Sequence, residues 1–275
     1  MKTKLQGLLK NSLYKIIPCL FWCFNLNLEN YVPLINNLGD VSAHYASFCK
    51  IDNVWEDIMQ NVDGIDFNEI NVFLQERGRI TEIQGENYYV ISREYVQNYI
   101  DDIENNHDED EDIDMEELRR IYLLILMWGY PNGNRGNAEL ILNNPDGISD
   151  FHQQYIINPE HEDLRQRFID ASNFHFNGMG SSTITKIFYF FREQHVDHAL
   201  ILDSMMKNII NYYDIDQFND IGPNTDNGKV TFSGTGYQLY CETLYEVSEE
   251  LHVDVDLLEY FLFAIVRNLD CANLE

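Results

Sequence analysis

Positively charged residues are scarce in this sequence of 275 residues. Eighteen lysines and arginines stand against 46 aspartates and glutamates, which gives a formal net charge of -28 at pH 7. Proteins that bind nucleic acid usually present a basic surface, so the overall balance argues against such a partner. Interactions between charges are nevertheless screened beyond roughly 8 Å in physiological salt. A short segment without acids can therefore still meet an anion.

The sequence also lacks the motifs of several enzyme and metal-binding classes. Its five cysteines form no C-x-x-C pair, and its histidines have no spacing typical of metal ligands. An odd, scattered set of cysteines indicates reduced intracellular thiols, with neither disulfides nor a zinc site. The sequence contains no G-x-S-x-G, no H-E-x-x-H and no P-loop. We therefore expect no metal and no cofactor.

No apolar run near the N-terminus is long enough to cross a membrane. The run "IIPCLFWCF" spans residues 16–24, whereas a membrane helix needs about 20 apolar residues. Lysines precede the run, as in a secretory signal, but no small-residue cleavage site follows it. We interpret it as a packed segment behind a basic arm, and we expect a cytoplasmic protein without membrane attachment.

The pattern of apolar residues divides the chain into three parts. Residues 1–100 form a mixed region with a predicted β-hairpin at 79–92, where alternating apolar residues flank a glycine turn. Residues 101–117 include eleven acids and predict a solvated acidic linker. Residues 118–275 have helical spacing interrupted by glycine and proline. The expected fold class is mainly α, with a smaller mixed α/β part at the N-terminus.

One segment of this acidic chain contains no acid. Residues 171–191 include the sequence "FNGMG" at 176–180, followed by two serines and a helical pattern. Glycines permit positive φ angles and a close approach of phosphate to the backbone. The helix that follows offers unpaired N–H groups and its positive dipole end, and serines add hydroxyl donors. We interpret the segment as a hairpin that binds double-stranded DNA; an ordinary packing corner is the alternative. The predicted contacts are Gly178, Met179, Gly180, Ser181 and Ser182.

Together with the region that follows, this segment resembles the helix-hairpin-helix DNA glycosylase superfamily. It is most similar to the 8-oxoguanine DNA glycosylase branch, which includes small bacterial proteins. In that family L-P-G-[VI]-G opens the hairpin, and an aspartate in a V-D motif follows further along the chain. Here Phe176 to Gly180 fills the first motif, and Leu202-Asp203 fills the second. The resemblance covers roughly residues 118–270 and implies the helical fold of that family.

The resemblance implies that a nucleotide is flipped from the duplex and that its N-glycosidic bond is broken. A carboxylate then stabilises the positive sugar, and Asp203 has the matching position, although a plain helix N-cap would explain it equally. The family places a lysine nucleophile two residues after the second glycine, where this sequence has Ser182. A serine forms no Schiff base, so we expect a monofunctional enzyme that uses water. Lys186, one turn later, is a displaced nucleophile, a cation that binds base or phosphate, or an ordinary solvated lysine.

A flipped base also needs flat side chains on its two faces. Trp128, Tyr130 and Phe261 are candidates for this base pocket, although core packing explains most aromatic residues at helical spacing. Phe261 and Phe263 cannot both face one pocket from a regular helix. Arg135, in the loop "NGNRGN", is a candidate DNA contact, with a solvent-exposed arginine as the alternative.

Two functions remain open on the sequence alone. The first is a DNA glycosylase-like enzyme that hydrolyses the N-glycosidic bond of a flipped damaged or modified base. The second is a non-catalytic module that retains the fold and binds DNA through the hairpin, or a basic protein through the acidic region. Asp203 and the Gly178-x-Gly180 turn favour the enzyme, whereas Ser182 and the net charge favour the binding module.

Overall fold

The protein has a mainly helical fold with a small antiparallel sheet, as the sequence predicted. The structure is a computed structural model. It describes residues 25–38, 46–51, 55–64, 66–106, 113–133, 137–192, 195–212, 214–215 and 231–272. The helices are η1 (Leu28–Tyr31), α3 (Val32–Asn36), α5 (Glu56–Gln60), α6 (Phe67–Glu76), α7 (Arg93–Asn106), α8 (Met115–Gly129), α9 (Asn137–Leu142), α10 (Pro145–His152), the π-helical turn η3 (Gln153–Ile157), α11 (Leu164–Asn173), α12 (Ser181–Phe190), α13 (Ser204–Tyr212), α14 (Gly234–Leu251) and α15 (Val255–Ala272). The strands are β1 (Asn25–Leu26), β2 (Ala46–Lys50), β3 (Ile80–Ile83), β4 (Glu86–Ser92) and β5 (Asp214–Ile215).

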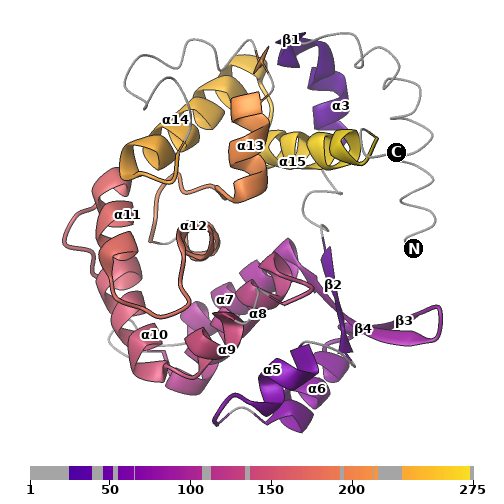
Figure 1. The fold of residues 1–275 in the computed structure, drawn as a ribbon, viewed down its shortest axis with the longest axis vertical. Coiled ribbons are helices and arrows are strands. Elements are labelled where there is room, and N and C mark those ends of the chain that lie inside the picture. The colour runs from indigo at the N-terminus through magenta and orange to yellow at the C-terminus, as the bar shows by residue number, and fades with distance from the viewer. Residues whose placement is uncertain are drawn as a thin grey trace.

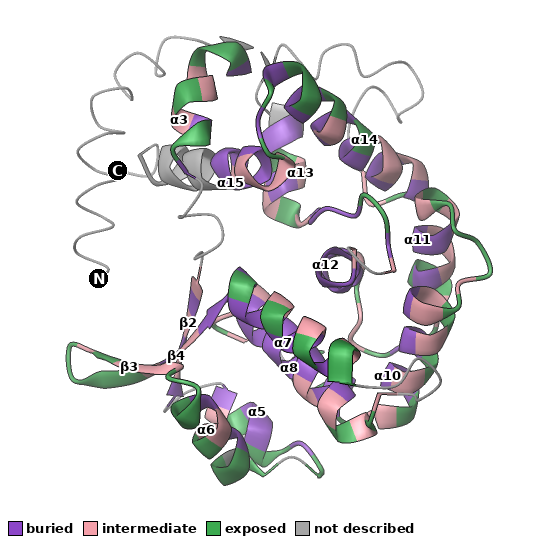
Figure 2. Ribbon diagram, turned by 180° about the vertical axis from the view of Figure 1, so that it is seen from behind, coloured by how far each residue is buried: buried purple, intermediate pink, exposed green. Residues whose placement is uncertain are grey.

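Helix α12 lies in the middle of the helical part. Helices α10, α11 and α14 form an arc around it, with α8 on one side and α13 and α15 on the other (Figure 1). Every residue from Thr183 to Phe190 is buried, as the uniform burial colour of α12 in Figure 2 shows. The sequence "TITKIFYF" has apolar residues on all faces, which is typical of a helix without a solvent side. The helices around α12 therefore determine where its few polar groups point.

The predicted hairpin is present in the N-terminal part. Strands β3 and β4 pair in antiparallel register, with Ile80 opposite Tyr89 and Ile83 opposite Glu86. Their two-residue turn has positive φ at Gln84 and Gly85, as in the type I′ turns that favour a right-handed strand twist. A further strand, β2, pairs with the other edge of β4 and gives the sheet order β2-β4-β3. Helix α8 packs on β2 and β4, so the sheet joins the helical part directly.

The acidic block at 101–117 is helical at both of its ends. Helix α7 continues through the acids to Asn106, because Ile100 and Ile103 on one face are buried. Helix α8 begins at Met115, and the side chain of Asp114 accepts a hydrogen bond from its first turn. The linker prediction is therefore wrong for 101–106 and 115–117. Residues 107–112 lie outside the described residues, and the three-part division of the chain stays a prediction.

Two other expectations concern the termini and the cysteines. The apolar run at 16–24 lies outside the described residues, and within the described chain no helix combines the length and apolarity needed to cross a membrane. Segments from the two ends of the chain meet, because α3 packs against α15 (Figure 1). Cys49 and Cys241 are buried free thiols, and burial raises the pKa of both.

A histidine is buried at the end of α10. His152 is 2% exposed, and its ring lies against those of Tyr122 and Phe191, with centroids 6.3 and 4.9 Å apart. Within the described residues, neither of its ring nitrogens has a hydrogen-bond partner. Burial and, to a smaller extent, the nearby His195 together lower the pKa of His152 to about 3. The folded protein therefore holds His152 neutral at pH values where the unfolded chain binds a proton.

This difference predicts that stability falls on acidification. The folded-state pKa is depressed, so the stabilisation is complete above the unfolded pKa of about 6.5 and is lost as the pH falls toward 3. For His152 alone, we expect the free energy of unfolding to be about 2 kcal/mol lower at pH 5 than at pH 8. Urea unfolding of the wild type and His152→Leu at both pH values measures this contribution as a difference. An equal pH dependence in the two proteins would contradict the assignment.

Candidate active site

The predicted hairpin joins α11 to α12, and its first glycine is required by the fold. Gly178 has a φ of +88°, where side chains are disfavoured. A Cβ on Gly178 would also lie 3.0 Å from the carbonyl oxygen of Asn137 and 3.2 Å from Cβ of Leu140, both on α9. Gly180 differs, because its φ is -96° and an added Cβ would meet nothing within 4 Å. The fold therefore explains a glycine at Gly178 but not at Gly180.

Helix α12 begins without a side-chain cap. Its N-cap is Gly180, and no side chain accepts a hydrogen bond from the first turn. The side-chain caps of α6, α8, α10, α11 and α14 are Asp66, Asp114, Asn144, Asp163 and Ser233. An uncapped helix start presents N–H groups and a positive dipole end. Gly180 is exposed and Ser181 and Ser182 are half-buried, so this start is accessible from solvent.

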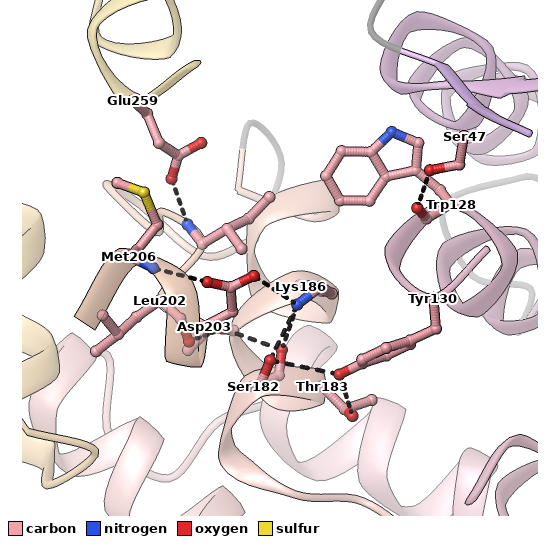
Figure 3. Close-up of polar contacts among 12 residues, drawn as sticks. Ser47, Trp128, Tyr130, Ser182, Thr183, Lys186, Leu202, Asp203, Met206 and Glu259 are labelled. Carbon is pink, nitrogen blue, oxygen red and sulfur yellow. Dashed lines mark hydrogen bonds and ion pairs between the residues drawn. The ribbon is translucent and has the colours of Figure 1, made fainter. Parts of the chain in front are cut away.

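Lys186 is a buried cation on α12, with 3% of its surface exposed. Its Nζ donates to Oγ of Ser182 at 3.0 Å and to the carbonyl oxygen of Ser182 at 3.4 Å. The ammonium lies 4.9 Å from the centre of the Tyr130 ring, whose hydroxyl contacts Ser182 and Thr183 in turn (Figure 3). A Cβ on Gly129 would lie 2.6 Å from Cδ of Lys186, so a side chain at this position would displace the lysine stem. The interpretation of Lys186 as a solvated lysine is wrong.

Asp203 is both a helix cap and the partner of Lys186. Its Oδ1 accepts from the backbone N–H of Met206 at 2.9 Å, in the first turn of α13. Its Oδ2 lies 3.9 Å from Nζ of Lys186, and Figure 3 shows the two side chains pointing toward one another. The hydroxyl of Thr185 donates to the carbonyl oxygen of Leu202, which ties the segment before Asp203 to α12. One carboxylate oxygen of Asp203 thus caps α13, while the other points toward Lys186.

Lys186 and Asp203 line a cavity of about 220 Å³. Trp128 also lines it, whereas Tyr130 does not, although its ring contacts Lys186. Phe261 does not line it; its ring packs against Tyr31, with centroids 5.5 Å apart. The full lining is Ser47, Arg93, Trp128, Gly129, Pro131, Asn132, Lys186, Ile201, Asp203, Met206, Glu259, Tyr260 and Phe263. Phe263 therefore takes the place that we expected for Phe261, while Arg135 lies outside the described residues.

A second charged pair lines the same cavity, and the sequence reasoning missed it. Arg93 Nη2 and Glu259 Oε2 are 2.8 Å apart, and their side chains are 10% and 2% exposed. Burial opposes the charge on Arg93, but Tyr189 and Glu259 keep its pKa above the ordinary value. Burial raises the pKa of Glu259, and Arg93 opposes that shift. The available signal was one acid inside the apolar run "LLEYFLF". Across the described ranges, no three His, Cys, Asp or Glu side chains cluster as a metal site requires.

Comparison with known families gives a match over most of the chain. Residues 65–263, more than half of the chain, match the model of the family described as "Putative 8-oxoguanine DNA glycosylase OGG-like protein". No curated protein and no solved structure matches the sequence. The match includes the hairpin, Lys186, Asp203 and every cavity residue except Ser47, and it confirms the resemblance seen in the sequence. The chain belongs to this OGG-like family.

Proposed function

We propose that the protein is a monofunctional DNA glycosylase that hydrolyses the N-glycosidic bond of a flipped damaged or modified base. The observation that carries this proposal is the pairing of Lys186 Nζ and Asp203 Oδ2, 3.9 Å apart on the wall of one cavity. The cavity also contains Trp128 and Phe263, which supply flat surfaces for a base. Membership of the OGG-like family supports the same reaction. A cytoplasmic location, where the protein would meet DNA, is part of the proposal.

The proposed reaction needs a carboxylate and a water molecule. The bond between the base and C1′ breaks, and the base leaves with the electron pair while positive charge develops on the sugar. Oδ2 of Asp203 stabilises that charge, since Oδ1 is already engaged with the first turn of α13. Water then adds its hydroxide to C1′, and its proton goes to the departing base. Lys186 orients Asp203, because its ammonium lies 3.9 Å from Oδ2 and attracts the carboxylate.

Double-stranded DNA is the proposed partner, held through the hairpin. The uncapped start of α12 offers N–H groups to a phosphate, and the serine hydroxyls of Ser181 and Ser182 add donors. Met179 lies between the two glycines and is half-buried. The rest of the chain is acidic, so we expect binding to depend on these few local contacts and to weaken as salt increases.

A second candidate is a glycosylase with lyase activity, and the position of Lys186 favours it. Lys186 lines the cavity beside Asp203, four residues after the position that Ser182 occupies. In this reaction Lys186 gives a proton to the departing base, and its amine forms a bond with C1′. The C1′–O4′ bond then breaks while a proton passes from the amine nitrogen to O4′, and the Schiff base so formed permits cleavage of the strand by β-elimination of the 3′-phosphate. The alternative of a non-catalytic module, which binds DNA through the hairpin or a basic protein through the acidic region, predicts no base release at all.

One assay separates these possibilities. Duplexes with a panel of modified bases are incubated with the protein, and each sample is divided before analysis. One half is heated in alkali, which cleaves abasic sites, and the other is not. We expect cleavage only after alkali, and no covalent adduct on addition of borohydride. Cleavage in both halves with a trapped adduct would establish the lyase, while binding without cleavage would establish the non-catalytic module.

We expect Asp203→Asn to reduce base release by roughly 100-fold or more, because it removes the charge that stabilises the sugar cation. Asparagine caps helices about as well as aspartate, so the melting temperature should change little. DNA affinity should stay equal or rise, because a negative charge is lost. Asp254→Asn is the matched control, since Asp254 caps α15 in the same way. Normal single-turnover rates for Asp203→Asn would exclude Asp203 as the catalytic carboxylate.

We expect Lys186→Gln to lower base release by roughly 100-fold, since Asp203 loses its counter-charge while a polar group remains beside Ser182. Lys207→Gln is the control, because Lys207 lies over the ring of Phe232 and does not line the cavity. Single-turnover rates and borohydride trapping are measured for both. A Lys186→Gln protein with wild-type activity would remove Lys186 from the mechanism.

Substitutions of the two hairpin glycines should have different effects, one on stability and the other on DNA binding. Gly178→Ala places a side chain at positive φ and against α9, so we expect a loss of about 1–2 kcal/mol in stability. Gly180→Ala meets no atom of the protein, so stability should change by less than about 1 kcal/mol. Its Cβ would keep a phosphate from the start of α12, and duplex affinity at low salt should fall. Melting curves and fluorescence anisotropy test both; unchanged affinity in Gly180→Ala would place the DNA elsewhere.

A further inference from the structure

Ser182 occupies the position of the lysine nucleophile in the glycosylases that the sequence resembles, and in the structure it contacts another lysine. It stands in the first turn of α12, two residues after the N-cap Gly180. Lys186 follows one turn later on the same face of the helix, so its side chain can reach back to Ser182. Nζ of Lys186 donates to Oγ of Ser182 at 3.0 Å. The sequence thus has, at the nucleophile position, an acceptor for the nitrogen of Lys186.

This hydrogen bond is the shortest polar contact that the nitrogen of Lys186 makes with the described residues. The carbonyl oxygen of Ser182 accepts from Nζ at 3.4 Å, and Oδ2 of Asp203 lies 3.9 Å away. Both distances exceed the usual range of an N–H···O hydrogen bond, whereas 3.0 Å is typical of one. Loss of Oγ would therefore leave the nitrogen with its weaker contacts only.

The stem of Lys186 does not fix the nitrogen by itself. Lysine has a flexible chain of four carbons. Gly129 limits this chain at Cδ, because a Cβ at that glycine would lie 2.6 Å from it. The same lysine lines the cavity of about 220 Å³, which leaves space beside it. The position of the nitrogen therefore depends on its hydrogen bond with Ser182.

Tyr130 holds Ser182 in turn. Its hydroxyl donates to Oγ of Ser182 at 3.4 Å and contacts Oγ1 of Thr183 at 3.0 Å. Its ring centre lies 4.9 Å from the nitrogen of Lys186. Figure 3 shows Ser182 between Lys186 and Tyr130. An acceptor that is itself held by a neighbour gives its donor a defined orientation.

We propose that Ser182 is a positioning residue that holds the nitrogen of Lys186 beside Asp203 and away from C1′ of the bound nucleotide. This inference rests on the proposed function and explains why the reaction ends with hydrolysis. Beside Oδ2 of Asp203, the ammonium orients the carboxylate while water reaches C1′. A released nitrogen instead attacks the aldehyde of an abasic site. It forms a bond with C1′, and the aldehyde oxygen leaves as water with two protons of the ammonium, which gives an imine.

The test follows two reactions that Ser182→Ala should move in opposite directions. Base release from the panel duplexes, in single turnover at saturating protein, should fall by roughly 10-fold because Asp203 loses its oriented partner. Adduct formation is measured on a duplex with a natural abasic site, prepared from a uracil duplex, with borohydride to reduce the imine. It should rise at least about fivefold over the wild type, because the nitrogen of Lys186 gains access to C1′. A merely structural loss would lower both rates.

Further variants identify the group that is responsible. Ser182→Thr keeps the hydroxyl and should retain both wild-type rates. Ser182→Cys has a similar size but a weak acceptor, so it should behave like Ser182→Ala and replaces it if the alanine variant unfolds. Ser182→Ala/Lys186→Gln should form no adduct, because the attacking nitrogen is absent. Ser248→Ala removes a serine hydroxyl of α14 outside the cavity and should leave both rates unchanged.

The outcomes separate this inference from the proposed function. Equal adduct formation in the wild type and Ser182→Ala overturns the role of Ser182, as does a fall in both rates. If base release by the wild type persists in that case, the glycosylase stands without this role. A rise in adduct without base release from any panel duplex leaves Ser182 as the positioning residue and removes the glycosylase. Absence of binding to the abasic duplex removes both.

Discussion

The buried ammonium of Lys186 is the constraint on which the centre of the protein depends. Moving a charge out of water costs several kcal/mol unless partners compensate, and Lys186 is only 3% exposed. Two oxygens of Ser182, the ring of Tyr130 and the carboxylate of Asp203 provide the compensation. Gly129 provides the space for the stem. The burial of this one cation therefore constrains which residues can stand at its contacts on α8, on α12 and before α13. It also holds Asp203, the carboxylate proposed for the chemistry, at the cavity wall.

The second ion pair of the cavity links the N-terminal part of the protein to the helical part. Arg93 belongs to the junction of β4 and α7, whereas Glu259 belongs to α15. Strand β2 adds to this connection, because Ser47 donates to the carbonyl oxygen of Trp128 and Cys49 to that of Met127. Removing one member of a buried pair leaves a charge without a partner. The position of the sheet is thus tied to the cavity by polar contacts as well as by packing.

Local features of the sequence predicted local features of the structure well. The hairpin turn within 79–92 and the cap at Asp203 each follow from a few neighbouring residues. Contacts between distant residues were not predictable in this way, since Arg93 and Glu259 are 166 positions apart. Periodicity also left open whether Phe261 or Phe263 faces the cavity, because either choice gives an apolar helix face. The burial of Lys186 could not be predicted either, because the space for its stem lies beside Gly129, which belongs to no recognisable motif.

Burial explains the absence of acids from one part of the segment, and the proposed contact with phosphate explains it in the other. From Thr183 to Phe190 the chain is buried in α12, so burial alone excludes carboxylates there. Burial does not explain residues 172–182, most of which are exposed or half-exposed. This part contains the exposed Gly180, which no steric contact requires to be glycine, and a helix start without a side-chain cap. An aspartate cap would stabilise that start, as Asp66 and Asp163 do for α6 and α11. Its absence in so acidic a chain is what a site for phosphate requires, because a cap would occupy the same N–H groups and repel the anion.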